Sequence, residues 1–213
     1  MFPTERPVTD LPADPRGLSL DYRQVRGVSR EGEWDGADEW TVTVRVRRFR
    51  DRVVGGEAGE LKLIRARKAE LFDWQPEGFL EPEIRDLLLR VFDMGHGGYR
   101  PPFGDHITST DGDLLVLHSV RLDPAWRGFG LGAILVSETV WTLADGCSAI
   151  ADATSRWETV GFRPRPAALG YLLDPRDSEA LALRELWRRE FGELCDAYRA
   201  AFPAGRGRRR SGG

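Results

Sequence analysis

Apolar and polar residues alternate most regularly in residues 41–47, Thr-Val-Thr-Val-Arg-Val-Arg. A period of two is typical of a strand that turns one face to a core and the other to water. A similar alternation returns in residues 61–67, Leu-Lys-Leu-Ile-Arg-Ala-Arg, after a segment that contains Gly55, Gly56 and Gly59. These two runs predict an antiparallel hairpin with a rather long connection.

A helix is predicted to begin at Glu81, because Pro82 suits its first turn and apolar residues follow at intervals of three and four. Its buried face would comprise Ile84, Leu87, Leu88 and Val91, and a glycine at position 95 would end it. Residues 95–113 are rich in glycine and proline and contain His96 and His106. This composition suits an irregular, mobile loop that lines or covers a site.

The middle of the chain has the order strand, glycine-rich loop, helix, strand. Residues 114–122 are an apolar run interrupted only by His118, Ser119 and Arg121, which predicts a strand at the centre of a sheet with both faces covered. A helix over residues 133–144 and a short buried strand over residues 147–151 follow the glycines. A short helix near residues 156–160, stopped by a glycine, and a strand near residues 170–173 complete this part.

Asp177 is expected to cap a long amphipathic helix that occupies residues 177–203. One stripe of that helix is apolar and consists of Leu183, Trp187, Phe191, Leu194, Tyr198 and Phe202. The stripe either covers the core of its own domain, which is the more common arrangement, or forms the face of a homodimer. Residues 1–18 contain four prolines and few large apolar groups, so we expect them to be disordered, and we expect the basic tail 204–213 to be flexible.

The composition favours one domain, because 41% of the 213 residues are apolar and this is enough for a substantial core. No stretch approaches the roughly 20 apolar residues of a membrane span, and no apolar secretory segment begins the chain. Only two cysteines are present, Cys147 and Cys195, and two reduced thiols are favoured over one isolated bridge. We therefore expect a cytoplasmic protein without a membrane partner. The net charge of -3 comes from 31 basic and 34 acidic residues mixed along the chain, which leaves no electrostatic footprint for nucleic acid.

Three glycines, Gly128, Gly130 and Gly132, alternate at the predicted passage from strand to helix. Glycines there let the backbone approach a ligand closely, and the first amides of the helix point outward with a partial positive charge. Together with Arg127, this pattern predicts a site for phosphate or pyrophosphate. A glycine-rich turn without a ligand is the alternative, since short glycine motifs also occur by chance.

Two nucleotide-binding motifs fit this segment less well. No Lys-Ser or Lys-Thr follows the glycines, which argues against a magnesium-dependent nucleotide hydrolase. A dinucleotide site requires the pattern GxGxxG and an acidic residue about 20 positions later. Asp152 lies near that distance but the third glycine is misplaced, so a dinucleotide site is only a weak competitor.

Residues 120–132, Val-Arg-Leu-Asp-Pro-Ala-Trp-Arg-Gly-Phe-Gly-Leu-Gly, resemble the signature of the GNAT superfamily of acyl-CoA-dependent N-acyltransferases, in which a strand leads to Pro and then Arg/Gln-x-x-Gly-x-Gly/Ala. Residues 157–162, Trp-Glu-Thr-Val-Gly-Phe, are similar to the family's Tyr-x-x-x-Gly-Phe helix ending. The resemblance covers residues 114–173. The hairpin at 40–70 would supply the family's second and third strands, and the helix at 81–92 would be an insertion.

The resemblance implies an α/β (α+β) fold over residues 19–203, with a mixed, mostly antiparallel sheet that is splayed at its middle and flanked by helices. Acetyl-CoA or another acyl-CoA would lie in the splay as co-substrate, without a metal. The backbone of Val120, Arg121 and Leu122 would bond the pantetheine and the thioester carbonyl. The pyrophosphate would be bound by the amides of Arg127, Gly128, Phe129, Gly130, Leu131 and Gly132. A small-molecule or peptide amine would then attack the thioester directly and accept an acetyl or other short acyl group.

His118 is the candidate catalytic base. It precedes Leu122 by four residues, so a two-residue period places it on the same face as Val120 and Leu122, toward the acyl group. A neutral imidazole accepts a proton from an ammonium at cytoplasmic pH, and a member of the superfamily has a histidine base at the matching place. The alternative is a core histidine bonded to a backbone carbonyl. The competing bases are Glu158, Asp113, His96 and His106.

Trp157 departs from the family pattern, because many members have a tyrosine there that protonates the departing thiolate. An indole has a donor N–H but no proton to give at physiological pH. The segment between residue 151 and Gly161 is also shorter than usual and lacks the family's Asn-x-x-Ala pattern. A second hypothesis is therefore an acyl-CoA-binding or ligand-sensing module that has lost catalysis.

Overall fold

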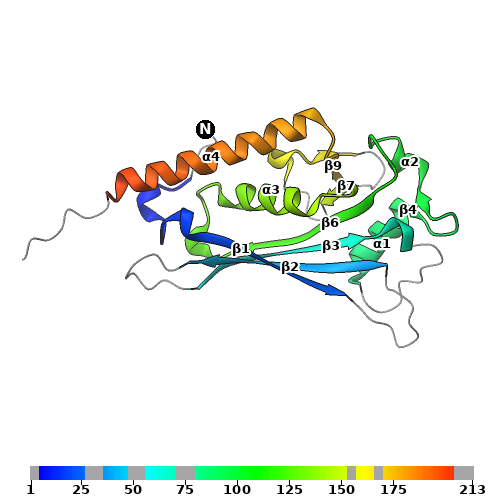
Figure 1. Cartoon of the computed structure of the whole chain (residues 1–213), viewed down its shortest axis with the longest axis horizontal. Helices are drawn as coiled ribbons and strands as arrows, with labels where there is room; N and C mark the ends of the chain where they lie inside the picture. The colour runs from blue at the N-terminus through cyan, green and yellow to red at the C-terminus, as the bar shows by residue number, and fades with distance from the viewer. Residues whose placement is uncertain are drawn as a thin grey trace, which may run out of the picture.

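The computed structural model describes residues 5–26, 36–47, 56–70, 80–152, 157–165 and 170–203. Within them the chain has a mixed α/β fold, in which a seven-stranded, mostly antiparallel sheet is accompanied by four α-helices (Figure 1). No helix in this described part combines the length and the apolar character that crossing a membrane requires.

The strands of the main sheet lie in the order β1-β2-β3-β6-β7-β9-β8. Their bounds are Leu18–Arg26 (β1), Ala37–Val46 (β2), Glu57–Ala66 (β3), Asp113–Leu122 (β6), Cys147–Asp152 (β7), Arg163–Pro164 (β8) and Tyr171–Leu173 (β9). Among these described strands only β6 and β7 pair in parallel, and the other neighbours pair antiparallel. β6 is therefore the central strand and the point at which the strand direction stops alternating.

The hairpin predicted from the alternating runs is confirmed, since β2 and β3 pair antiparallel with Val42 opposite Leu61. Both of these side chains are fully buried, whereas Thr43 and Lys62 on the alternate positions are partly or fully exposed. The predicted long connection lies outside the described residues. β1, which the sequence did not lead us to expect, pairs with β2 and forms one edge of the sheet.

Four helices have the bounds Pro82–Val91 (α1), Pro101–Gly104 (α2), Leu131–Leu143 (α3) and Ser178–Ala201 (α4). α1 is confirmed with the four buried residues that its apolar spacing predicted. The irregular loop predicted for residues 95–113 is wrong in part, because it contains α2 and one strand of a two-stranded ribbon, β4 (Phe92–Asp93) and β5 (Gly98–Tyr99). The order arises from aromatic burial, since the Tyr99 ring stacks on Phe92 and on Phe103 with centroids 4.6 and 5.1 Å apart.

Side chains on the two faces of the sheet form two separate cores. α3 and α4 lie along one face, which we call the α3 face (Figure 1), and Leu115 and Leu117 of β6 belong to its core. α1 packs on the opposite face, the α1 face, with Leu114 and Val116 in its core. The remaining residues of β6, 118–122, are partly or fully exposed. The prediction that β6 is covered on both faces therefore holds only for its first half.

The apolar stripe of α4 covers the core of its own domain. Trp187 and Leu194 are buried within the α3-face core, and Phe191 and Tyr198 pack against it from partly exposed positions. Phe202 at the end of the stripe is 41% exposed. Asp177 caps the helix as expected, because its carboxylate accepts a hydrogen bond from the amide of Glu179 at 3.1 Å.

Part of the N-terminal segment that we expected to be disordered packs on the fold. Residues 5–17 include two short 3-10 turns, Val8–Asp10 and Pro15–Gly17, which lie against α4. Leu11 is 5% exposed, and burial of its side chain offsets part of the entropy of ordering the segment. The basic tail at residues 204–213 lies outside the described residues.

Three neighbouring strands are joined at one end of the sheet through Asp38, whose side chain is 0% exposed. Its carboxylate accepts a hydrogen bond from Nε of Arg26 at 3.1 Å, and two from Arg67, from Nε at 2.9 Å and from Nη2 at 2.7 Å. Both guanidinium groups are partly exposed to solvent. Asp38 is thus a buried charge that, in the described part of the chain, is paired with the side chains of Arg26 and Arg67 at the rim.

Candidate functional site

The central strand β6 separates from β7 halfway along its length. The two strands pair from Asp113 to Leu117 on β6, where Leu117 lies opposite Asp152 at the end of β7. Residues 119–122 remain paired with β3, but residues 118–122 have no partner strand on the β7 side among the described residues. Half of the backbone N–H and C=O groups in this stretch therefore face away from any described strand, and a ligand that lies beside them can form strand-like hydrogen bonds.

A β-bulge at His118 coincides with this separation. Lys62 of β3 lies opposite Ser119 and the next residue, Leu63, lies opposite Leu117, so His118 is an extra residue without a counterpart. The bulge shifts the alternation of side chains, and Val120 packs on the α3-face core together with Leu117.

His118 consequently lies on the α1 face. We predicted that it shares a face with Val120 and Leu122, and that prediction is wrong, because the extra residue of the bulge breaks the two-residue period. Nε2 of His118 is 3.0 Å from Oε2 of Glu81, the residue that precedes α1, and the His118 side chain is 19% exposed. The partner of the imidazole is thus a carboxylate, whereas the core-histidine alternative requires a backbone carbonyl.

The glycine loop that follows β6, residues 127–132, is anchored by two buried aromatic residues. Trp126 and Phe129 are 4% and 2% exposed and fix the loop to the α3-face core. Gly128 and Gly130 have φ angles of +84° and +75°, which L side chains rarely adopt. Gly130 is the N-cap of α3, and a side chain added there would meet no atom within 4 Å. The loop therefore presents open backbone at the start of α3.

The amides of this loop are available to a ligand. The amides of Leu131 and Gly132, in the first turn of α3, and that of Gly128, which precedes the helix, donate no hydrogen bond to another described residue. Arg127 is exposed and its Nε donates to the carbonyl of Leu122 at 2.8 Å. The guanidinium thus lies over the end of β6 and occupies one of the backbone groups that the resemblance assigns to pantetheine.

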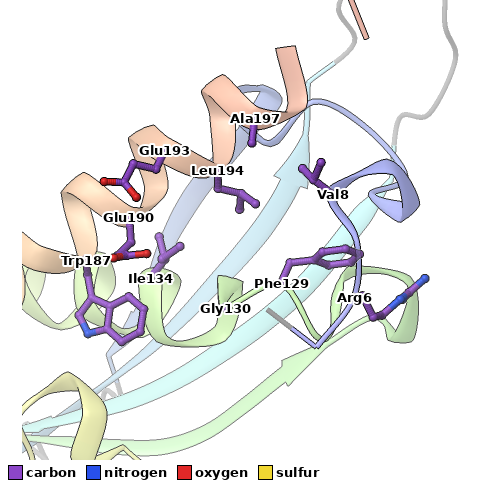
Figure 2. A pocket seen from close by; sticks show the side chains of 10 residues that line it. All are labelled: Arg6, Val8, Phe129, Gly130, Ile134, Trp187, Glu190, Glu193, Leu194 and Ala197. Carbon is purple, nitrogen blue, oxygen red and sulfur yellow. The ribbon is translucent and has the colours of Figure 1, made fainter. Parts of the chain in front are cut away.

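The N-terminal segment packs on the other side of the same loop, an arrangement that sequence reasoning missed. The amides of Glu5 and Arg6 donate to the carbonyl of Gly128 at 2.9 and 3.2 Å, and the Arg6 guanidinium lies 4.9 Å from the centre of the Phe129 ring. A cavity of about 120 Å³ remains between this segment, Gly130 and α4. Figure 2 shows the side chains that line it, among them the carboxylates Glu190 and Glu193. Arg6 also lines the cavity, but two carboxylates against one guanidinium leave the lining net negative and make the cavity a poor phosphate site.

Trp157 lies beside the first turn of α3. A Cβ atom built on Gly132 would be 3.4 Å from Cη2 of the Trp157 indole and 3.8 Å from Cδ1 of Leu122, so the indole, the helix and the end of β6 meet at this point. Nε1 of Trp157 is buried and has no hydrogen-bond partner among the described residues. An unpaired buried N–H lowers stability by roughly 1–3 kcal/mol.

This geometry predicts how substitutions of Trp157 affect stability. Trp157→Phe is expected to leave the free energy of unfolding within about 1 kcal/mol of the parent, because removal of the unpaired N–H offsets the smaller ring. Trp157→Ala is expected to cost about 2–3 kcal/mol through lost packing. Urea denaturation followed by circular dichroism compares the variants. A phenylalanine variant as unstable as the alanine variant would show that the indole N–H has a partner.

The competing bases lie in other surroundings. Asp113, at the start of β6, is held by Arg65 at 2.8 Å and by the amide of Lys68 at 3.1 Å. His96 is exposed and contacts Asp93 at 3.0 Å in the turn between β4 and β5. Neither Asp113 nor His96 contacts His118 at the bulge in β6.

Tyr171 and its partner Glu158 lie near the end of β7, where β7 has separated from β6. Tyr171 is opposite Asp152 in the sheet, and its phenol is hydrogen-bonded with Glu158. That bond raises the pKa of Tyr171, so the phenol keeps its proton at neutral pH. No sequence motif marks Tyr171, because only the pairing of β9 with β7 brings it here.

The pairing of the strands argues against a dinucleotide-binding site. A dinucleotide-binding unit needs consecutive parallel strands, whereas β7 is followed in the sheet by the antiparallel strand β9. Asp152 is 3% exposed at the end of β7. The described residues also contain no group of three or more His, Cys, Asp and Glu side chains that would hold a metal ion.

Comparison of the chain with protein-family models, with curated proteins and with solved structures gives no match.

Proposed function

We propose that the protein is an N-acyltransferase that uses acetyl-CoA or another short acyl-CoA, with a GNAT-like splayed sheet. The observation that carries the proposal is the unit formed by β6, the glycine loop and α3. β6 separates from β7 after Leu117 and then leads through Gly128 and Gly130 into the open first turn of α3. Unpaired strand backbone followed by free helix amides suits an amide-containing chain that ends in a pyrophosphate.

The residues present fit such a ligand on one side of the loop. The backbone of Val120, Arg121 and Leu122 would contact the pantetheine, with Arg127 releasing the carbonyl of Leu122, and the loop from Arg127 to Gly132 would hold the pyrophosphate. The cavity beside Gly130 carries Glu190 and Glu193, so the phosphates would lie on the side of the loop that faces Leu122. Arg127 already reaches that side and would add a positive charge.

The protein's own groups suffice for direct transfer to an amine. His118 would take a proton from the amine, a C–N bond would form at the thioester carbon, and the C–S bond would break. Tyr171, protonated at neutral pH, or solvent would supply a proton to the leaving thiolate in place of the tyrosine that Trp157 replaces. The acceptor would be a small-molecule or peptide amine.

A cytoplasmic location is part of the proposal. Cys147 and Cys195 are free and buried, as we expected for reduced thiols. Burial raises the pKa of each thiol to about 11, so both are in the unreactive thiol form at neutral pH. Free thiols are ordinary in a reducing compartment.

Binding of CoA tests the proposed site. Gly130→Glu is expected to weaken CoA binding at least about tenfold, because it adds a carboxylate at the start of α3, beside the amides that would bind the phosphates. Gly130→Asn is the matched control, since asparagine tolerates a positive φ and adds no charge. Isothermal titration calorimetry measures both. If the glutamate variant binds CoA as tightly as the parent, the loop is not the pyrophosphate site.

A second function is favoured by the position of Trp157. The indole lies beside Gly132 at the start of α3, and the motif that resembles the family's has a tyrosine at this position of the chain; a tryptophan there suits a module that binds acyl-CoA without turning it over. Incubation with acetyl-CoA and a panel of amines, followed by assay of free thiol, separates the two functions. Thiol release that depends on the amine supports the enzyme, whereas tight binding without release supports the module.

A further inference from the structure

A polar pocket of about 70 Å³ opens on the α1 face at the bulge in β6. It is lined by residues of three neighbouring strands and by the residue that precedes α1, namely Glu39, Trp40, Thr41, Lys62, Leu63, Ile64, Glu81 and His118. Two carboxylates, one ammonium group and one imidazole are its titratable side chains. With a neutral imidazole the pocket is therefore net negative.

The side chain of Glu81 contacts a residue of the pocket and not the helix that Glu81 precedes. It is the N-cap of α1, yet its side chain accepts no hydrogen bond from the first turn. Its carboxylate instead reaches Nε2 of His118, 3.0 Å away on β6. Ser, Thr, Asp and Asn are the preferred N-caps, so helix formation does not account for a glutamate at this position.

The contact with Glu81 also determines which nitrogen of the imidazole is free. A carboxylate beside Nε2 favours a proton on that nitrogen, which leaves Nδ1 as the acceptor of the neutral ring. Among the described residues no group bonds to Nδ1. His118 is thus held in a form that accepts a proton at a vacant nitrogen.

We infer that this pocket binds the amine acceptor as a small cation and that Glu81 is a positioning residue for His118. The inference rests on the proposed N-acyltransferase function. Glu39 and Glu81 attract an ammonium group, whereas Lys62 opposes it and limits the charge that the pocket accepts. The role of α1 would be to hold Glu81 beside β6. The family resemblance identifies this helix as an insertion.

In this arrangement the amine would reach His118 from the α1 face, over β2 and β3, and the thioester would lie along the edge of β6 that has separated from β7. A thioester bound along residues 118–122 lies where β6 has separated from β7, and the pocket opens at the same bulge. One proton of the ammonium passes to Nδ1 of His118, and the freed lone pair forms the C–N bond as the C–S bond breaks. The CoA thiolate then takes up a proton, and a second proton leaves the acylated nitrogen to solvent.

Binding of simple probes tests the pocket without CoA. Butylamine, 1-butanol and butyrate are added separately to the isotope-labelled full chain, and the ring signals of His118 are followed by NMR. We expect saturable shifts with butylamine only. Glu81→Gln should weaken butylamine binding about fivefold, and Lys62→Gln should strengthen it by a similar factor. Glu83→Gln is the control, since Glu83 is an exposed carboxylate in the first turn of the same helix.

Turnover of acetyl-CoA with butylamine tests the positioning role. Glu81→Gln is expected to lower kcat and to alter the pH–rate profile without a change in acetyl-CoA affinity, and Glu83→Gln should match the parent. If butylamine shifts the His118 signals but acetyl-CoA neither binds nor reacts, the protein binds amines in this pocket but is not an N-acyltransferase. If 1-butanol and butyrate shift His118 as butylamine does, or if Glu81→Gln equals Glu83→Gln in both assays, the inference is overturned.

Discussion

Replacement of Asp38 by asparagine is expected to lower the free energy of unfolding by about 3 kcal/mol. Asp38 is fully buried and its two oxygens accept three hydrogen bonds from Arg26 and Arg67. An asparagine side chain keeps one acceptor oxygen but turns an NH2 group toward a guanidinium, which leaves donors facing donors. The exposed parts of the two arginines retain water, so the loss is smaller than for a wholly buried pair.

Asp21→Asn is the matched control for this prediction. Asp21 pairs with Arg45 at 2.8 Å across β1 and β2, but both side chains are more than half exposed. Its replacement is expected to cost less than about 1 kcal/mol. Urea denaturation followed by tryptophan fluorescence measures both variants. Equal decreases in the free energy of unfolding for Asp38→Asn and Asp21→Asn would mean that burial of the carboxylate does not determine its contribution to stability.

Replacement of His118 by alanine is expected to lower the turnover of acetyl-CoA with an amine acceptor by about 100-fold or more. The reason is the loss of the proposed proton acceptor, whose imidazole lies at the bulge of β6 and lines the same pocket as Glu81. CoA affinity should remain unchanged, because the proposed contacts to CoA come from backbone groups of β6 and the glycine loop. The activity should also lose its rise with pH near neutrality.

His96→Ala controls for loss of an imidazole as such. His96 also lies 3.0 Å from a carboxylate, that of Asp93, but in an exposed turn that does not line the pocket. Steady-state kinetics across pH 6–9, with calorimetry for CoA, compare the two variants. Full turnover and an unchanged pH profile in His118→Ala would place the base elsewhere and leave His118 as a packing residue.

Elements whose signal is local were predictable from the sequence. The period of two in β2 and β3 and the spacing of three and four in α1 and α4 are set by backbone geometry, so they identify the buried faces without knowledge of the partner. The glycine loop is local as well, since the left-handed conformations of Gly128 and Gly130 need only the residues themselves. The apolar residues 133–143 likewise predicted most of α3.

Other features depended on contacts between distant residues. The N-terminal segment has little local preference for order, and it is held because Leu11 is buried and Glu5 and Arg6 bond the carbonyl of Gly128. The aromatic contacts of Tyr99 likewise order a segment whose glycines and prolines suggested a loop. In both cases burial of a few side chains outweighs the local propensity.

The candidate site divides in the same way. The sequence alone determined which residues form the glycine loop and singled out His118, because both are matters of residue type and of position along one segment. Only the tertiary structure decided the face on which His118 lies and its partner. One extra residue in β6 relative to β3 reverses the alternation of side chains at His118. The packing of α1 on that face then brings Glu81, 37 positions earlier in the chain, to 3.0 Å from the imidazole.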